Sequence, residues 1–305
     1  MSTDLEEDRI EDGDVVLRRK KAPRERKPVT KDAVLKAMSV TLGVLREKQH
    51  PRVQLFADAA SASLAEAAAL ALGARPAMAE ESAEAAQLAD ASDGLAVSLA
   101  SITKMRAEAV RAAVSHCVAS AKPWVLSPEI RLPLTMRIFL AKELVRRLPG
   151  IVIGSEEEII ALAGGDTPTA KMDGAAQREA ADRAAGRIVE EMHAAVMVVA
   201  SSSARIFAED RPSLTVKMPQ AAAAQLARMP GKDAALAAVA ATFLGLLRNH
   251  KYAAAACAAV AVAVAGEIAS ETEVTPMAFQ AKFIDALFSL NDGSIAKRVK
   301  LAIGD

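Results

Sequence analysis

Two patterns of apolar residues alternate along the chain from about position 33 onward. Alanine-rich stretches have the spacing of a helix face, and short runs of Val, Ile and Leu separate them. Short unbroken apolar runs between helices are typical of parallel strands buried on both faces. The sequence therefore predicts an α/β fold with a mostly parallel central sheet covered by helices on both faces. Helices are expected at 32–49, 61–72, 83–89, 104–120, 135–147, 156–163, 175–193, 233–248, 253–270 and 276–290, and strands at 53–56, 94–99, 124–126, 151–153, 195–200, 204–207 and 214–217.

The most apolar segment, residues 253–265, consists almost entirely of Ala and Val. A bilayer span needs about 20 apolar residues, so this shorter stretch predicts a buried core helix and no membrane span. The two cysteines, Cys117 and Cys257, lie too far apart for a disulfide framework, which favours a reducing compartment such as the cytoplasm. His116 precedes Cys117, but neighbouring helical side chains diverge, so we expect no reactive pair there.

Charge is segregated at the N-terminus, although the 38 basic and 38 acidic residues balance overall. Residues 1–14 carry seven acidic side chains and one Arg, whereas a secretory or mitochondrial leader needs positive charge, so we expect that the chain is not secreted. Few apolar residues and no periodicity predict a disordered arm at 1–32, followed by a single domain at 33–305. The cations of this arm are Arg18, Arg19, Lys20, Lys21, Arg24, Arg26, Lys27 and Lys31.

The arm has two interpretations. It is a solubilising tail, or it docks on nucleic acid or on an acidic protein surface. No aromatic residue is interleaved among the cations, which weakens the case for stacking on single-stranded bases. The sequence leaves both interpretations open.

Five short motifs occur in the same order as in a known family. They read LALGARPAMA at 70–79, AVSLASI at 96–102, KPWVLSP at 122–128, IGSEEEI at 153–159 and PGKDA at 230–234. This series resembles the hydroxyethylthiazole kinases of thiamine salvage, in which the same places read LALGASPxMA, xxNIGTL, KPxVLDP, RGNxxEI and TGxGC. The resemblance extends over about 53–290 and implies a ribokinase-like fold. It also implies ATP and Mg²⁺ as cofactors, a thiazole alcohol as substrate, and a homotrimer with sites between subunits.

The resemblance also assigns site residues. Met78 and Gly231 match positions on the substrate side. Glu158 ends the family's magnesium-associated Asn-x-x-Glu pattern, in which the Asn has become Ser155. Ser155 and Lys232 then lie on the nucleotide side, and Asp233 is the candidate general base.

The departures from the family fall on positions that handle the nucleotide. Ile153 stands where the family has an Arg used on ATP, and Ala200 where it has a Thr. Asp233 replaces a glycine of the anion-binding turn, and Ala234 replaces the catalytic Cys. Because phosphoryl transfer depends on positioning and charge neutralisation, we expect that catalysis is lost, that no cofactor is bound, and that the chain is a binding or structural subunit of a larger assembly. The alternative is an active ATP-dependent hydroxyethylthiazole kinase. A third possibility is a protein that still binds the thiazole or another ligand without turnover.

The candidate residues also have purely structural interpretations. Asp233 caps a helix that begins at Ala234, which stabilises that helix by about 1 kcal/mol. The three glutamates at 156–158 are candidates for binding a metal ion, but they also suit the positive end of a helix dipole. Met78, next to a proline, fills a gap in the core.

Overall fold

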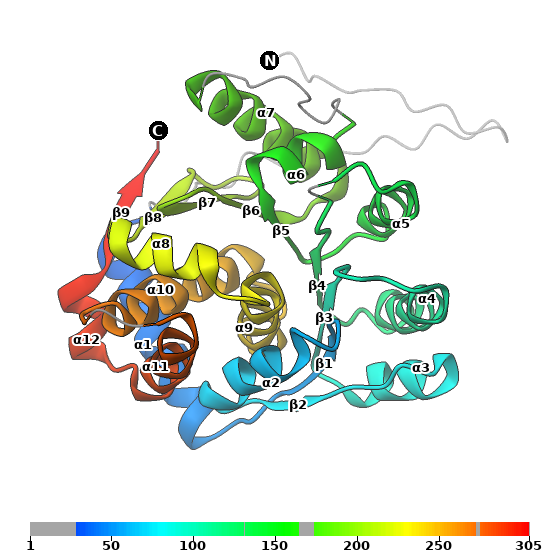
Figure 1. The fold of residues 1–305 in the computed structure, drawn as a ribbon, viewed down its shortest axis with the longest axis horizontal. Coiled ribbons are helices and arrows are strands. Elements are labelled where there is room, and N and C mark those ends of the chain that lie inside the picture. The colour runs from blue at the N-terminus through cyan, green and yellow to red at the C-terminus, as the bar shows by residue number, and fades with distance from the viewer. Residues whose placement is uncertain (1–28, 131, 165–173, 273–274, 305) are drawn as a thin grey trace, which may run out of the picture.

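The computed structural model describes residues 29–130, 132–164, 174–272 and 275–304, which Figure 1 draws as a coloured ribbon. Positions 1–28 of the predicted arm, with the seven cations between Arg18 and Lys27, lie outside the described residues. The described residues form a central sheet with helices on both of its faces. The predicted α/β architecture is therefore confirmed.

Within the described residues, the middle layer is a nine-stranded sheet in the order β2-β1-β3-β4-β5-β6-β7-β8-β9. Neighbouring strands from β2 to β6 are parallel, and those from β6 to β9 are antiparallel. The register pairs Val53 with Gly94 and Val199 with Ala204. The strands are β1 (Arg52–Phe56), β2 (Arg75–Ala77), β3 (Gly94–Ser98), β4 (Trp124–Ser127), β5 (Ile151–Ser155), β6 (Ala195–Val199), β7 (Ser203–Phe207), β8 (Leu214–Lys217) and β9 (Lys300–Ile303).

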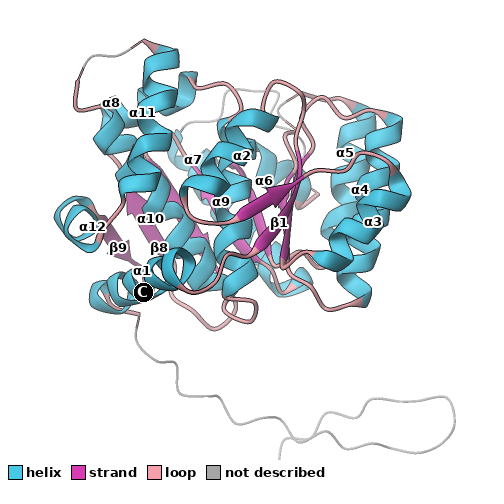
Figure 2. Cartoon of the chain, turned by 90° about the horizontal axis from the view of Figure 1, so that it is seen from below, coloured by secondary structure: helices cyan, strands magenta, loops and turns pink. Residues whose placement is uncertain are grey.

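Two helix layers enclose this sheet (Figure 1). One layer contains α1 (Lys31–Glu47), α2 (Ala62–Ala71), α8 (Gln220–Arg228), α9 (Lys232–Leu246), α10 (Lys251–Ala269), α11 (Pro276–Ser289) and α12 (Asp292–Arg298). The other contains α3 (Ser82–Ala91), α4 (Lys104–Ala119), α5 (Thr135–Val145), α6 (Glu156–Leu162) and α7 (Gly174–Met192). Figure 2 shows α1 toward one end of the molecule, with α8 and α11 toward the opposite end.

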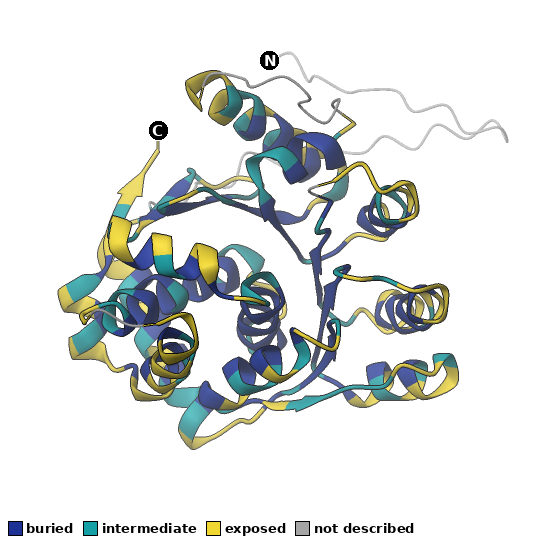
Figure 3. Ribbon diagram, in the orientation of Figure 1, coloured by how far each residue is buried: buried dark blue, intermediate teal, exposed yellow. Residues whose placement is uncertain are grey.

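Each helix layer buries its own apolar cluster against the sheet. Figure 3 shows the buried strands, and the helix sides that face them, in dark blue. The helices α9 and α10 lie within the larger cluster and are buried along most of their length. By length and composition α10 could cross a bilayer, but 72% of its apolar window is buried inside the molecule, as expected for a core helix.

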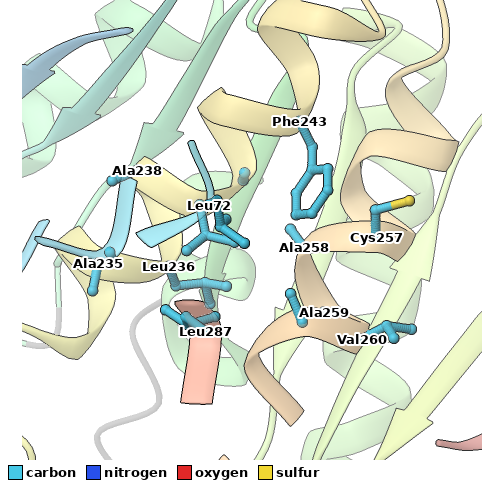
Figure 4. Packing of buried hydrophobic residues seen from close by; sticks show 14 of the residues in the cluster. Leu72, Ala235, Leu236, Ala238, Phe243, Cys257, Ala258, Ala259, Val260 and Leu287 are labelled. Atoms are coloured by element: carbon cyan, nitrogen blue, oxygen red, sulfur yellow. The ribbon is translucent and has the colours of Figure 1, made fainter. Parts of the chain in front are cut away.

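Small residues let α9 approach its neighbours closely. Figure 4 shows Phe243 of α9 beside Cys257 and Ala258 of α10. On the sheet side, a methyl group added to Gly94 would lie 2.9 Å from the carbonyl oxygen of Ala241. Only a residue without a side chain allows this contact between the helix backbone and the start of β3. The contact fixes α9 against the sheet.

Side-chain caps explain where several helices begin. The Oγ1 of Thr30 accepts a hydrogen bond from the backbone N–H of Ala33 at the start of α1. The Oγ1 of Thr103 accepts one from the N–H of Arg106 at the start of α4. Each cap satisfies a first-turn N–H group that has no partner within the helix.

Four short elements were not predicted: α8, α12, β2 and β9. The run of alanines after Pro219 does favour a helix, so α8 had a local signal. By contrast, β9 is largely exposed and has a mixed sequence, and only its pairing with β8 makes it a strand.

Candidate functional site

The carboxyl ends of β5 and β6 border a cavity of about 520 Å³. Ser155 ends β5, Val199 ends β6 and Lys232 begins α9, and all three residues line the cavity. In open α/β sheets, ligands bind in crevices at the carboxyl ends of parallel strands. The cavity therefore lies where this kind of fold places a ligand.

Apolar side chains make up most of the cavity wall. Leu226 comes from α8, Leu236 from α9 and Phe283 from α11, and Met229 lies between α8 and α9. Walls of this kind bind a flat or aromatic group by contact, while a few polar groups set its orientation. The polar lining residues are Ser155, Glu157, Ser201, Lys232 and Asp233. Three of the residues predicted from the sequence are therefore brought together.

Lys232 and Asp233 form an ion pair at the N-terminus of α9. The Lys232 Nζ lies 2.7 Å from the Asp233 Oδ1, and both side chains are about three-quarters covered. The prediction that Asp233 caps a helix starting at Ala234 is wrong, because α9 begins at Lys232. The capping residue is Gly231, whose φ of +75° turns the chain directly into the helix. Asp233 therefore lies in the first turn, where its charge is favourable to the helix dipole.

Gly231 and Met78 do not line this cavity. A methyl group on Gly231 would lie 3.0 Å from the Cα and Cβ of Ser61, so this glycine allows α9 to begin close to the start of α2. Met78 is half-buried and packs against the larger core cluster. Their assignment to the substrate side stays a prediction.

Ser155 and Glu158 form a capping box at the start of α6. The Glu158 Oε2 accepts a hydrogen bond of 2.7 Å from the Ser155 N–H, and the Ser155 Oγ accepts one from the Glu158 N–H. Glu158 is only 3% exposed. Its carboxylate thus starts a helix in this structure, and the magnesium role predicted for it stays a prediction. The described residues contain no group of three or more His, Cys, Asp or Glu arranged to hold a metal ion.

Glu157, one of the three glutamates considered as metal ligands from the sequence, lines the cavity, whereas its neighbour Glu158 does not. Its Oε1 accepts a hydrogen bond of 2.6 Å from the Gln177 Nε2 of α7. Consecutive helix positions are rotated by about 100°. Because Glu158 turns back onto Ser155, Glu157 is the carboxylate of α6 that reaches the cavity.

A buried cation lies behind the start of α6. Arg205 of β7 is 5% exposed, and its Nη1 lies 2.9 Å from the Glu156 Oε1. Its Nε donates to the Asp182 Oδ1 of α7 at 2.8 Å. These two carboxylates hold Arg205, which does not line the cavity. Among the described residues, the basic side chain that lines the cavity is Lys232.

A model described as the Hydroxyethylthiazole kinase family matches residues 44–293, which is most of the chain. The chain belongs to this family. Its ribokinase-like fold follows from that membership and from the sheet described above.

Hydroxyethylthiazole kinases of several bacteria are similar over most of this chain. The one from Rhizobium etli (strain CIAT 652) is 30% identical over 268 residues, which cover 86% of this chain and 99% of the relative. The one from Klebsiella pneumoniae (strain 342) is 34% identical over 220 residues, covering 72% of this chain and 82% of the relative. The solved hydroxyethylthiazole kinase structure from Pyrococcus horikoshii OT3 has a TM-score of 0.78 at 22% identity, covering 88% of this chain and all of that one.

As a member of the hydroxyethylthiazole kinase family, this chain differs at positions seen in the sequence. Ile153 is 2% exposed and belongs to the core, so it presents no charge to the cavity. Ala200 lines the cavity but carries no hydroxyl group. Ser127, which ends β4 in place of an acidic residue, is also buried. These three residues therefore contribute no charge to the cavity.

The sequence analysis also did not predict a polar cluster that lies at the carboxyl ends of β1 and β3. The Asp58 Oδ1 accepts a hydrogen bond from the Ser61 N–H at 2.9 Å, and the Arg106 Nη2 lies 2.6 Å from the Glu80 Oε1. Burial alone would raise the pKa of Asp58, but hydrogen bonds from Ser61 and Ser101, with the charge of Arg106, lower it below its ordinary value. The cluster holds Ser61 against Gly231.

Neither cysteine belongs to the candidate site. Cys117 and Cys257 are buried, and burial raises the pKa of each thiol to about 12. His116 is exposed while Cys117 faces the core, so the expectation that they form no reactive pair agrees with the structure.

Proposed function

We propose that this protein is an ATP-dependent kinase that phosphorylates the alcohol of hydroxyethylthiazole, with Lys232 and Asp233 in place of the lost family residues. The observation that carries the proposal is the convergence of Ser155, Glu157, Lys232 and Asp233 on one cavity at the carboxyl edge of the sheet. The bacterial relatives named above are hydroxyethylthiazole kinases, and the match covers 99% of one and 82% of the other. This is the alternative that the sequence left open, and it conflicts with the expected loss of catalysis.

The oxygen groups of the cavity fit a magnesium ion. Mg²⁺ is usually held by one or two carboxylates together with phosphate oxygens and water. Glu157 supplies a carboxylate and Ser155 a hydroxyl group. Bound there, the ion would neutralise charge on the phosphates.

Each polar residue then has a role. Lys232 places a positive charge beside the phosphates, which are also favoured by the N-terminus of α9. Asp233 accepts the proton of the attacking hydroxyl group. The apolar wall that includes Leu226 and Phe283 contacts the flat base of the nucleotide and excludes water.

A catalytically inactive protein is the second candidate, and one observation favours it. Lys232 and Asp233 pair with each other at 2.7 Å, which cancels the charge that phosphates would need. Ile153 and Ala200 add nothing to replace it. The chain would then serve as a binding or structural subunit of a larger assembly.

Binding and turnover measured together separate the two candidates. We expect that the wild-type chain binds Mg-ATP in a calorimetric titration and phosphorylates hydroxyethylthiazole. The substitution Asp233→Asn should lower kcat by about 10²-fold or more, because the proton acceptor is lost, while the Kd for Mg-ATP stays within about threefold.

Asp285→Asn is the matched control. Asp285 is exposed on α11, and the hydrogen bond from Ser289 goes to its backbone oxygen, so both stability and turnover should stay unchanged. Wild-type chain that neither binds Mg-ATP nor turns over would reject the kinase and favour the second candidate. Turnover that survives Asp233→Asn would reject the role of Asp233.

A further inference from the structure

The three glutamates at the start of α6 have different surroundings, although they are consecutive in the chain. Glu158 accepts a hydrogen bond from the Ser155 N–H. Glu156 pairs with Arg205, and its side chain is 15% exposed. Glu157 lines the candidate cavity. A helix fixes where a glutamate side chain starts, but its rotatable bonds leave the direction open, so contacts from other elements select that direction.

One side chain of α7 contacts both Glu157 and Glu156. The Gln177 Nε2 donates to the Glu157 Oε1 at 2.6 Å and lies 3.4 Å from the Glu156 Oε2. The first bond is short, whereas the second is longer than an ordinary N–H···O hydrogen bond. Gln177 therefore holds mainly Glu157. This bond uses one oxygen of the Glu157 carboxylate and does not involve the other.

Arg205 keeps Glu156 from competing for the same amide. It lies in the middle of β7, between β6 and β8, and is 5% exposed. Its Nη1 lies 2.9 Å from the Glu156 Oε1, and its Nε donates to the Asp182 Oδ1 at 2.8 Å. Since the guanidinium group is planar and rigid, it fixes the directions of both contacts. The Glu156 carboxylate is thus drawn toward a buried charge, and the Gln177 amide is left to Glu157.

Gln177 lies in the first turn of α7, a long helix that is held in place along its length. Ala184 and Ile188 of α7 are buried in the apolar cluster of this helix layer. The bond between Arg205 and Asp182 also ties α7 to β7. The Gln177 amide therefore comes from a fixed support. Groups that orient a metal-binding carboxylate from behind in this way control its affinity for the ion.

We propose that Gln177 is a positioning residue that holds the Glu157 carboxylate toward the cavity for Mg²⁺, and that Arg205 supports it by binding Glu156. The proposal rests on the binding of Mg-ATP suggested above, but not on turnover. Neither Gln177 nor Arg205 lines the cavity, so both act through Glu157. A carboxylate that is already held loses less side-chain freedom when it binds an ion.

The test measures how much Mg²⁺ strengthens the binding of ATP to the full chain. Calorimetric titrations with ATP, in EDTA and in excess Mg²⁺, give two Kd values, and their ratio is the gain from Mg²⁺. We expect a ratio of about tenfold or more for the wild type. Gln177→Ala should lower the ratio to about threefold or less, because Glu157 is no longer held. The Kd in EDTA should stay within about twofold, since Gln177 does not line the cavity.

A double variant shows whether Gln177 acts through Glu157. Glu157→Gln alone should lower the ratio, because the carboxylate is lost. Adding Gln177→Ala to Glu157→Gln should change the ratio by less than about twofold, since the group through which Gln177 acts has already been removed. Losses that add in full would overturn the positioning role.

The role of Arg205 is tested by rescue. Arg205→Met should lower the ratio, because Glu156 is then free to accept from Gln177. Arg205→Met combined with Glu156→Gln should return the ratio to within about threefold of the wild type, since the competing carboxylate is gone. A ratio that stays low in the combined variant would remove Arg205 from the proposal.

Gln87→Ala is the matched control for Gln177→Ala. Gln87 is exposed on α3 and does not line the cavity, so the ratio should stay within about 1.5-fold of the wild type. Gln177 is only partly buried, and thermal midpoints close to that of the wild type would show that both variants are folded.

Three results would overturn the proposal. They are an equal loss in Gln177→Ala and Gln87→Ala, an unchanged ratio in Gln177→Ala, and a wild-type chain that binds ATP equally well with and without Mg²⁺. All three leave the binding of nucleotide at the cavity intact. A wild-type chain that binds no ATP in either condition would instead reject the proposed function, and the positioning role with it. Binding without turnover would reject the kinase alone.

Discussion

At the scale of single residues, the two buried thiols give a prediction for alkaline pH. In the unfolded chain each thiol ionises near its ordinary pKa of 9.0, whereas burial raises the pKa to about 12 in the folded protein. Between these values the folded state binds more protons, so a rise in pH favours unfolding. We expect the free energy of unfolding, measured with urea, to fall by roughly 1 kcal/mol per pH unit and per thiol above about pH 9.

The double variant Cys117→Ala with Cys257→Ala isolates this effect. Its free energy of unfolding should depend less steeply on pH over the same range. Part of the slope remains, because burial also raises the pKa of Tyr252 to about 12. An identical slope in the variant and the wild type would mean that the thiols ionise equally in both states.

The sequence predicted which residues meet at the candidate cavity better than it predicted how their side chains lie. The motifs pointed to Ser155, Lys232 and Asp233, and these residues line one cavity. The resemblance assigned the magnesium role to Glu158, although the spacing Ser155-x-x-Glu158 is that of a capping box, in which this glutamate turns back onto the helix start. The cap assigned to Asp233 was wrong because the positive φ of Gly231 starts α9 at Lys232.

At the scale of elements, periodicity identified the long helices and the buried strands. It failed where an element depends on a distant partner. The strand β9 pairs only with β8, and the contribution of its own sequence is weak. The helix α8, which closes one wall of the candidate cavity, was missed although its alanines favour a helix.

The contact between α9 and β3 is expected to depend on one glycine. Gly94→Ala would force a methyl group to within 2.9 Å of the Ala241 oxygen, and backbone atoms on both sides resist movement. We expect this substitution to lower the free energy of unfolding by about 1–3 kcal/mol, measured by urea denaturation.

Gly43→Ala is the control for this substitution. Gly43 lies inside α1, and a methyl group added there meets nothing within 4 Å. Alanine also restricts the unfolded chain, so the protein should become more stable by about 0.5–1 kcal/mol. A loss of stability of similar size in both variants would show that the close approach of α9 is not the cause.

At the scale of the whole molecule, the two ends of the sheet differ in charge. The candidate cavity at the carboxyl edge holds two carboxylates and one Lys, whereas seven Lys or Arg and two acidic residues line three cavities at the amino ends of the parallel strands. The sequence could not reveal this division, because the net charge is zero and these cations come from loops and helix ends far apart along the chain. These cations come together only when the chain folds.

The strand order has a consequence for synthesis on the ribosome. The strand β8 pairs with β9 on one of its two sides, yet more than 80 residues separate Lys217 of β8 from Lys300 of β9. At a synthesis rate of about 5–20 residues per second, the side of β8 that later pairs with β9 stays unpaired for several seconds. During that interval a nascent chain presents unpaired backbone groups that a second nascent chain could join. A chaperone that shields this side of β8 would therefore matter most before residue 300 is translated.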